Sequence, residues 1–92
     1  MAWTKLDDGI YDNPKILTVE PTDRLLYVWA LCWSNRHHTD GVIPAKMLRY
    51  VAMFAGCGDH DAAASRLVEA GLWDNAPDGW TIHDFAEYQL SA

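Results

Sequence analysis

The fold of this chain is decided by one long predicted helix, PTDRLLYVWALCWSNRHH, residues 21–38. A proline, a threonine and an aspartate begin this segment, as is typical of helix N-termini, and residues 25–33 that follow are apolar without a break. Because the apolar side chains fall on nearly every side of the helix, we expect other elements to cover it from several directions. Trp29 and Trp33 are accordingly predicted to lie in the core.

Shorter elements are predicted after the long helix. Residues 41–44 leave room for a strand of two or three residues, and a second helix follows whose apolar positions have the spacing of one buried face. Those positions are Met47, Leu48, Val51, Ala52 and Phe54. A third helix is predicted to begin at a cap supplied by Asp59 or Asp61 and to stop at Gly71.

The last third of the chain has the pattern of a β-hairpin. Residues 72–74 and 80–85 read as two strands, and the segment between them, 75–79, is rich in turn-forming residues. Residues 86–90 are long enough for a final helical turn. At the other end, residues 1–20 are predicted to form an extended arm with a possible short helix.

This order of elements predicts the fold class. Helix, short strand, helix, helix and two-stranded hairpin is the order of a winged helix, a variant of the helix-turn-helix fold. We therefore expect a mainly helical α+β protein with three core helices and a C-terminal β-hairpin. The 92 residues fit one winged-helix domain, 1–92, and are too few for two self-sufficient cores.

Composition excludes several classes of protein. Half of the residues are hydrophobic and 22% are charged, so the chain can bury a core and does not have the composition of a disordered segment. The longest apolar run has nine residues, whereas a membrane-spanning helix needs about 20. The N-terminus lacks the apolar segment of a signal peptide, and two cysteines do not make a disulfide framework. We therefore expect a cytoplasmic protein with free thiols and no membrane partner.

Six blocks of sequence carry a resemblance to a known family. They are Trp3-Thr4-Lys5-Leu6-Asp7-Asp8, Asn13-Pro14-Lys15, Asn35-Arg36, Thr39-Asp40-Gly41-Val42-Ile43-Pro44, Ala70-Gly71-Leu72-Trp73 and Gly79-Trp80-Thr81-Ile82-His83-Asp84-Phe85. Over nearly its whole length the chain resembles a family of small proteins and N-terminal domains encoded by phages and prophages of actinobacteria. That family is similar in organisation to winged-helix N-terminal domains of phage replisome organisers and bacterial primosomal proteins. The resemblance implies a role near DNA replication or regulation in the cytoplasm of a bacterial host.

The candidate contacts to duplex DNA are cationic side chains. A winged helix usually meets phosphates with the start of its second helix, the exposed side of its third helix and the wing. The candidates are Arg36, His37, His38, Lys46, Arg49 and Arg66. Thirteen acidic and seven basic residues give a net charge of -6, which is the wrong sign for a protein that coats phosphates, so any DNA contact must be local. The alternative is that these residues are solvated surface charges.

Tryptophans provide a second candidate surface. Five tryptophans and four tyrosines are many for one small core, and such side chains commonly anchor protein interfaces. Trp3, Trp73 and Trp80 lie near chain or hairpin ends, where a ring can remain partly exposed. We predict an interface there, with a second copy or with a host protein. The alternative is that Trp73 and Trp80 close the hairpin over the third helix.

Metal binding and catalysis are less favoured. Cys57 and His60 have the spacing of a ligand pair, but Cys32 lies in an apolar helix where a cysteine acts as a small hydrophobic residue. No Gly-rich phosphate loop or nucleophile elbow is present, so we expect neither an enzyme nor a cofactor or small-molecule substrate. The sequence thus predicts a non-enzymatic, DNA-associated module in replication or transcription regulation. The alternative is a protein-interaction or oligomerisation module that does not bind DNA directly.

Overall fold

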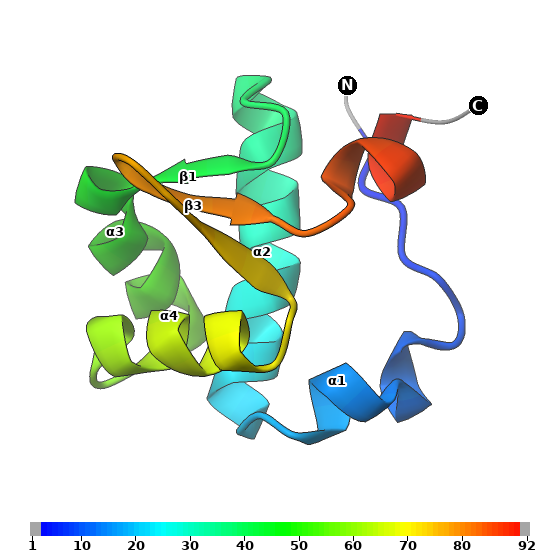
Figure 1. Ribbon diagram of the computed structural model, residues 1–92, viewed down its shortest axis with the longest axis horizontal. Helices are drawn as coiled ribbons and strands as arrows, with labels where there is room; N and C mark the ends of the chain where they lie inside the picture. The colour runs from blue at the N-terminus through cyan, green and yellow to red at the C-terminus, as the bar shows by residue number, and fades with distance from the viewer. Residues whose placement is uncertain (1–2, 91–92) are drawn as a thin grey trace.

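The computed structural model describes residues 3–90, apart from the side chains of Tyr88 and Leu90, and shows helices packed around a small antiparallel sheet (Figure 1). In chain order the elements are a 3-10 turn η1 (Ile10–Asp12), α1 (Pro14–Leu17), α2 (Pro21–His37), β1 (Val42–Pro44), α3 (Ala45–Ala55), α4 (His60–Glu69), β2 (Trp73–Ala76), β3 (Gly79–Ile82) and a π-helical turn η2 (Ala86–Leu90). The mainly helical α+β class and the predicted order of elements are confirmed. No helix in this part of the chain is long and apolar enough to cross a membrane.

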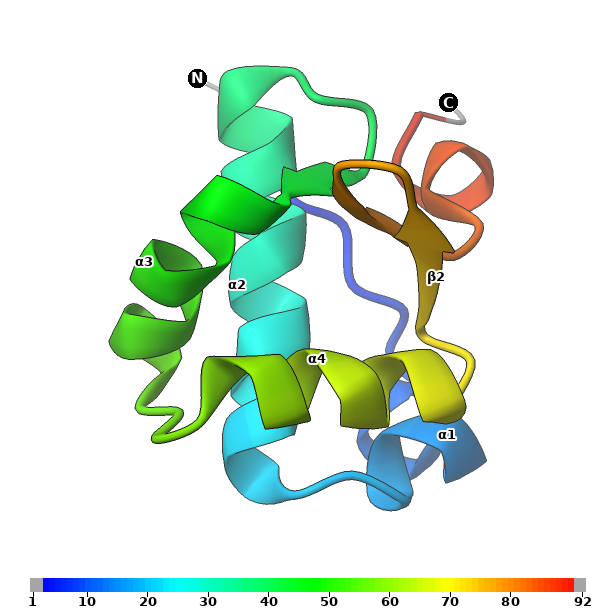
Figure 2. The same cartoon turned by 60° about the vertical axis from the view of Figure 1, so that its left-hand side comes forward.

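Helix α2 is central, as predicted. It contacts α3, α4 and β1, and Figure 2 shows α3 beside it and α4 crossing its lower half. Leu26 and Ala30 are fully buried, and Trp33 is partly buried against the core. The prediction for Trp29 is wrong, because its side chain is 39% exposed and its indole N–H donates to the carbonyl oxygen of Phe54 at 3.1 Å. One apolar strip of α2 therefore lies at the surface.

Hydroxyl groups build the turn from α2 into β1. The Gly41 N–H donates to Ser34 Oγ at 2.7 Å, and the Thr39 hydroxyl donates to the carbonyl oxygen of Val42 at 2.7 Å. The Thr39 hydroxyl has one proton, and that proton is used in the bond to Val42. The buried Ser34 hydroxyl therefore donates to Thr39 Oγ1, 2.7 Å away. Gly41 has φ 88°, and a Cβ at this position would lie 2.7 Å from Phe85 Cβ. This chain of bonds ends the helix at His37, one residue before the predicted end at residue 38.

The sheet has the strand order β1-β3-β2, and both pairings are antiparallel. The hairpin turn is shorter than predicted, because Ala76 pairs with Gly79 and only residues 77–78 connect the strands. Strand β3 also ends at Ile82, earlier than the predicted Phe85, since the chain turns at residues 83–84. The strands and the helices both contribute to the core, whose largest fully buried apolar side chains are Leu26, Ile43, Leu48, Leu67 and Trp73.

The hairpin is tied to the start of α3. Pro44 occupies the N-cap position of α3 and offers no side-chain hydrogen bond, and the Ala45 N–H donates to the carbonyl oxygen of Asp78 at 2.9 Å. This contact requires the backbones to approach closely at Gly79. A Cβ there would overlap the carbonyl oxygen of Ile43 and lie 2.8 Å from the Ala45 nitrogen. Glycine is therefore needed at this position.

We expect Gly79→Ala to lower the free energy of unfolding by at least about 2 kcal/mol, because the added methyl group forces the hairpin away from α3. Gly58→Ala is the control, since a Cβ at Gly58 meets nothing within 4 Å. It should change the free energy by less than about 0.5 kcal/mol. Urea unfolding followed by circular dichroism measures both variants. Equal stabilities would contradict the close approach at Gly79.

Candidate interaction surfaces

The predicted DNA contact Arg66 is joined to the core. Its Nε and Nη2 donate to the two carboxylate oxygens of Asp23 at 2.6 Å and 3.0 Å, linking α4 to the start of α2. Asp23 is fully buried and also accepts a hydrogen bond from the Glu20 N–H at 3.2 Å. The hydrogen bond with Asp23 raises the pKa of Arg66 above its ordinary value. Arg66 thus acts first as the partner of a buried carboxylate.

Cys57 lies beside this ion pair. Its thiol donates to the carbonyl oxygen of Thr22 at 3.5 Å. Burial, followed by the negative charge of Asp23, raises the pKa of the Cys57 thiol. A protonated thiol is a poor metal ligand. Within residues 3–90, no three His, Cys, Asp or Glu side chains gather as a metal site would require.

The outward side of α4 carries acidic and neutral residues. Asp61, Ser65 and Glu69 are exposed and lie four residues apart, so they share one side of the helix. The exposed hairpin turn, Pro77 and Asp78, adds another anion. These are two of the three surfaces that were predicted to meet phosphates. Their charge opposes such contacts.

The other predicted cations gather at the opposite end of α3 from α4. Five of them are exposed on the last turn of α2 and the first turns of α3, namely Arg36, His37, His38, Lys46 and Arg49. Only a short turn and the three residues of β1 separate the two groups, and both lie in the upper half of Figure 1. Arg49 donates to the hydroxyl oxygen of Tyr50 at 3.0 Å, and its guanidinium lies 5.0 Å from the centre of that ring. This cationic end is separate from Arg66.

The predicted interface tryptophans are in three different situations. Trp3 is exposed, and Trp80 is partly buried. Trp73 is only 1% exposed, so the prediction that its ring lies partly uncovered is wrong. Trp73 lies on the side of β2 that faces α4. The centre of its ring is 5.9 Å from the centre of the Trp80 ring. Trp73 therefore agrees with the alternative prediction, in which its ring closes the hairpin over the third helix, α4.

An exposed apolar surface lies where the sequence analysis did not place one. We call it the α2–α3 face and define it by Leu25, Trp29, Tyr50, Met53 and Phe54. Phe54 was predicted to be buried, but it is 74% exposed, and Met53 is 62% exposed. The bond from Trp29 to Phe54 joins the two helices, and the spacing of the other residues makes the face continuous. The signal in the sequence was Tyr50, Met53 and Phe54 at i, i+3 and i+4, on the side of α3 opposite its buried residues.

The α2–α3 face has the size of the largest apolar patch on an ordinary monomer. At about 200 Å² for each large side chain, the exposed fractions amount to roughly 500 Å². The largest apolar patch on an ordinary monomer covers about 300–600 Å² and is often functional. The face is therefore a stronger candidate for an interface than the hairpin tryptophans.

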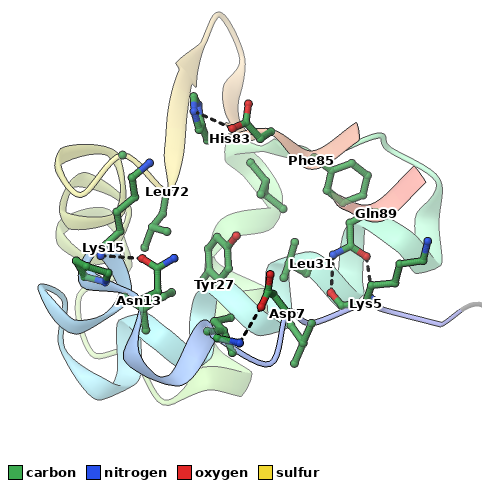
Figure 3. Close-up of a pocket in the computed structure, with 18 of the residues that line it drawn as sticks. Lys5, Asp7, Asn13, Lys15, Tyr27, Leu31, Leu72, His83, Phe85 and Gln89 are labelled. Atoms are coloured by element: carbon green, nitrogen blue, oxygen red, sulfur yellow. Dashed lines mark hydrogen bonds and ion pairs between the residues drawn. The ribbon is translucent and has the colours of Figure 1, made fainter. Parts of the chain in front are cut away.

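A pocket of about 680 Å³ lies between the N-terminal arm and the body of the protein (Figure 3). Its apolar wall includes Leu31, Leu72 and Phe85. The arm is held across it by Gln89, whose side-chain amide accepts from the Lys5 N–H at 3.0 Å and donates to the Lys5 carbonyl oxygen at 2.7 Å. The pocket thus depends on how the two ends of the chain dock.

One histidine lies at the rim of this pocket. His83 Nδ1 is 2.9 Å from an Asp74 carboxylate oxygen, and Nε2 is 3.3 Å from an Asp84 carboxylate oxygen. Both ring nitrogens of His83 therefore face carboxylates, and one of these, Asp84, also lines the pocket. The arrangement holds the histidine in place and does not resemble a nucleophile–base pair.

Comparisons with known proteins find no matching family model, curated protein or solved structure. The function must therefore be inferred from these surfaces.

We expect Arg66→Ala to lower the melting temperature by at least about 10 °C, because it leaves the buried Asp23 carboxylate without its cation. Arg36→Ala removes an exposed arginine of the same size and should leave the melting temperature nearly unchanged. Thermal unfolding followed by circular dichroism compares the two. Similar melting temperatures for both variants would show that the ion pair does not stabilise the fold.

Proposed function

We propose that the chain is a winged-helix module. The order α2-β1-α3-α4-β2-β3 supports this assignment, as does the sheet order β1-β3-β2, in which the strand before α3 pairs with the second strand of the hairpin. In this assignment α3 and α4 are the helix-turn-helix pair, and the hairpin is a short wing.

The module has no catalytic role and works by binding protein through the α2–α3 face. The observation that carries this proposal is the exposure of Met53 and Phe54 beside Trp29, on a face of roughly 500 Å². Aromatic residues and methionine are enriched at protein interfaces, and burial of this surface removes apolar area from water. A setting near DNA replication or regulation in the bacterial cytoplasm is favoured by the resemblance to phage replication domains.

The charges on the surfaces of α4 and the wing favour protein binding over contacts with bases in a DNA groove. Asp61 and Glu69 on α4 and Asp78 in the turn would repel phosphates, and Arg66 is engaged with Asp23. A helix that reads bases in the major groove needs donors that reach base edges. The outward side of α4 offers mainly carboxylates and a serine.

Site-specific photo-crosslinking tests the proposed surface. A photoreactive amino acid at position 53 should give protein adducts in bacterial cells, because Met53 is a well exposed residue of the α2–α3 face. The same amino acid in place of Tyr11, which is exposed in η1 outside the face, is the control and should give few adducts. Adducts from position 11 alone, or none from either position, would exclude the α2–α3 face as the binding surface.

Local DNA contact by the cationic end is the second candidate function. It is favoured by the exposure of Arg36, Lys46 and Arg49 around β1. Three phosphate contacts would make the logarithm of the affinity fall with the logarithm of salt concentration at a slope of about -3.

The double variant Lys46→Ala/Arg49→Ala should weaken duplex binding equally for unrelated sequences, because phosphate contacts carry no sequence information. Lys15→Ala, at the other end of the molecule, should have no effect. Fluorescence anisotropy with two duplexes at several salt concentrations measures these affinities. Binding that does not depend on salt, or that the double variant leaves intact, would rule out this candidate.

A further inference from the structure

We infer that the α2–α3 face binds a second copy of this chain, in an antiparallel arrangement around a two-fold axis that passes the apolar residues 50–54 of α3. This inference rests on the proposed function, because it names the partner of the same face. Three observations support it: the order of charges along the face, the self-complementarity of that order, and the apolar area.

Charge changes sign from one end of the face to the other. Lys46 and Arg49 are exposed on the first turns of α3, ahead of the apolar centre at Tyr50, Met53 and Phe54. Acidic residues follow the helix, since Asp59 and Asp61 are exposed in the loop after α3 and the first turn of α4. Figure 1 shows α3 descending from β1 toward the start of α4. The face is therefore cationic at its upper end, apolar in the middle and anionic at its lower end.

This order of charges is complementary to itself under a two-fold rotation. When two α3 helices lie antiparallel with their apolar centres in contact, Lys46 and Arg49 of one copy lie toward the acidic residues of the other. Because the two copies are related by the two-fold axis, this attraction between opposite charges occurs at both ends of the interface. A parallel arrangement would instead bring like charges together, which costs affinity. A partner with one sign of charge would complement only one end of the face.

The apolar area fits one half of an ordinary interface. A standard interface buries about 800 Å² on each partner, of which about 57% is non-polar, or roughly 450 Å². The exposed area of the five residues of the face is roughly 500 Å², most of it from apolar side chains. A second copy thus covers the face without requiring further apolar surface from either chain.

The first test measures self-association of the purified chain by sedimentation equilibrium over a concentration series. Phe54→Asp should weaken the dimer at least about 30-fold, because it places a charge at the centre of the contact. Tyr11→Asp is a matched control: Tyr11 is 77% exposed, lies in η1 outside the face, and should leave the dimer unchanged. Circular dichroism and the melting temperature verify that each variant folds.

The second test uses charge exchange to determine the arrangement. Asp61 is chosen because Asp59 caps α4 by accepting the Ala62 N–H at 3.1 Å. Lys46→Glu and Asp61→Lys should each weaken self-association roughly tenfold, since like charges then face each other twice. An equimolar mixture of the two variants should restore association, because a mixed dimer has opposite charges at both contacts.

The outcomes separate this inference from the proposed function. A chain that stays monomeric to millimolar concentration, while position 53 crosslinks a protein of different mass, overturns the dimer and leaves the protein-binding proposal standing. A chain that neither self-associates nor gives adducts at position 53 overturns both. A dimer that resists Phe54→Asp, or whose charge variants do not recover on mixing, overturns the antiparallel arrangement. A dimer that meets both tests, with position 53 crosslinking a second copy, supports the inference.

Discussion

The ion pair between Asp23 and Arg66 is the contact on which the arrangement of this protein depends. A carboxylate that is fully buried needs a cation and hydrogen bonds, and within residues 3–90 the element that brings a cation to Asp23 is α4. The pair fixes α4 across the start of α2, and the chain after α4 enters the hairpin. It also decides which side of α4 faces water, because turning Arg66 inward leaves Asp61 and Glu69 outward. One stabilising contact therefore shapes both the fold and the acidic character of this surface.

Much of the fold could be predicted because its signals are local. The Asp59 cap, the break after α2 and the hairpin each depend on residues within a few positions, and all three are found. Apolar periodicity was less informative in α3. Its sequence contains two apolar stripes, and periodicity alone does not tell which stripe faces the core, so Phe54 was placed inside. Trp29 was misplaced for a similar reason, because α2 is apolar on nearly every side.

The candidate surfaces were harder to predict, since they depend on contacts between distant residues. Arg66 has the properties of a phosphate contact until its partner Asp23, 43 residues away, is known. Trp73 looked like an edge residue because the short strand β2 gives no indication of how deeply α4 covers it. The net charge of -6 indicated that any DNA contact would be local, and the structure exposes five cationic residues on the end of α2 and the start of α3.

The bond from the Ala45 N–H to the Asp78 carbonyl has a consequence for the order of folding. Pro44 gives α3 no side-chain cap, so the hairpin supplies a cap from 33 residues further along the chain. Closing so long a loop costs conformational entropy, and contacts between residues far apart in sequence slow folding. The first turn of α3 is then completed only when the C-terminal hairpin docks. During synthesis, the surface of α3 would reach its final geometry after nearly the whole domain has emerged from the ribosome.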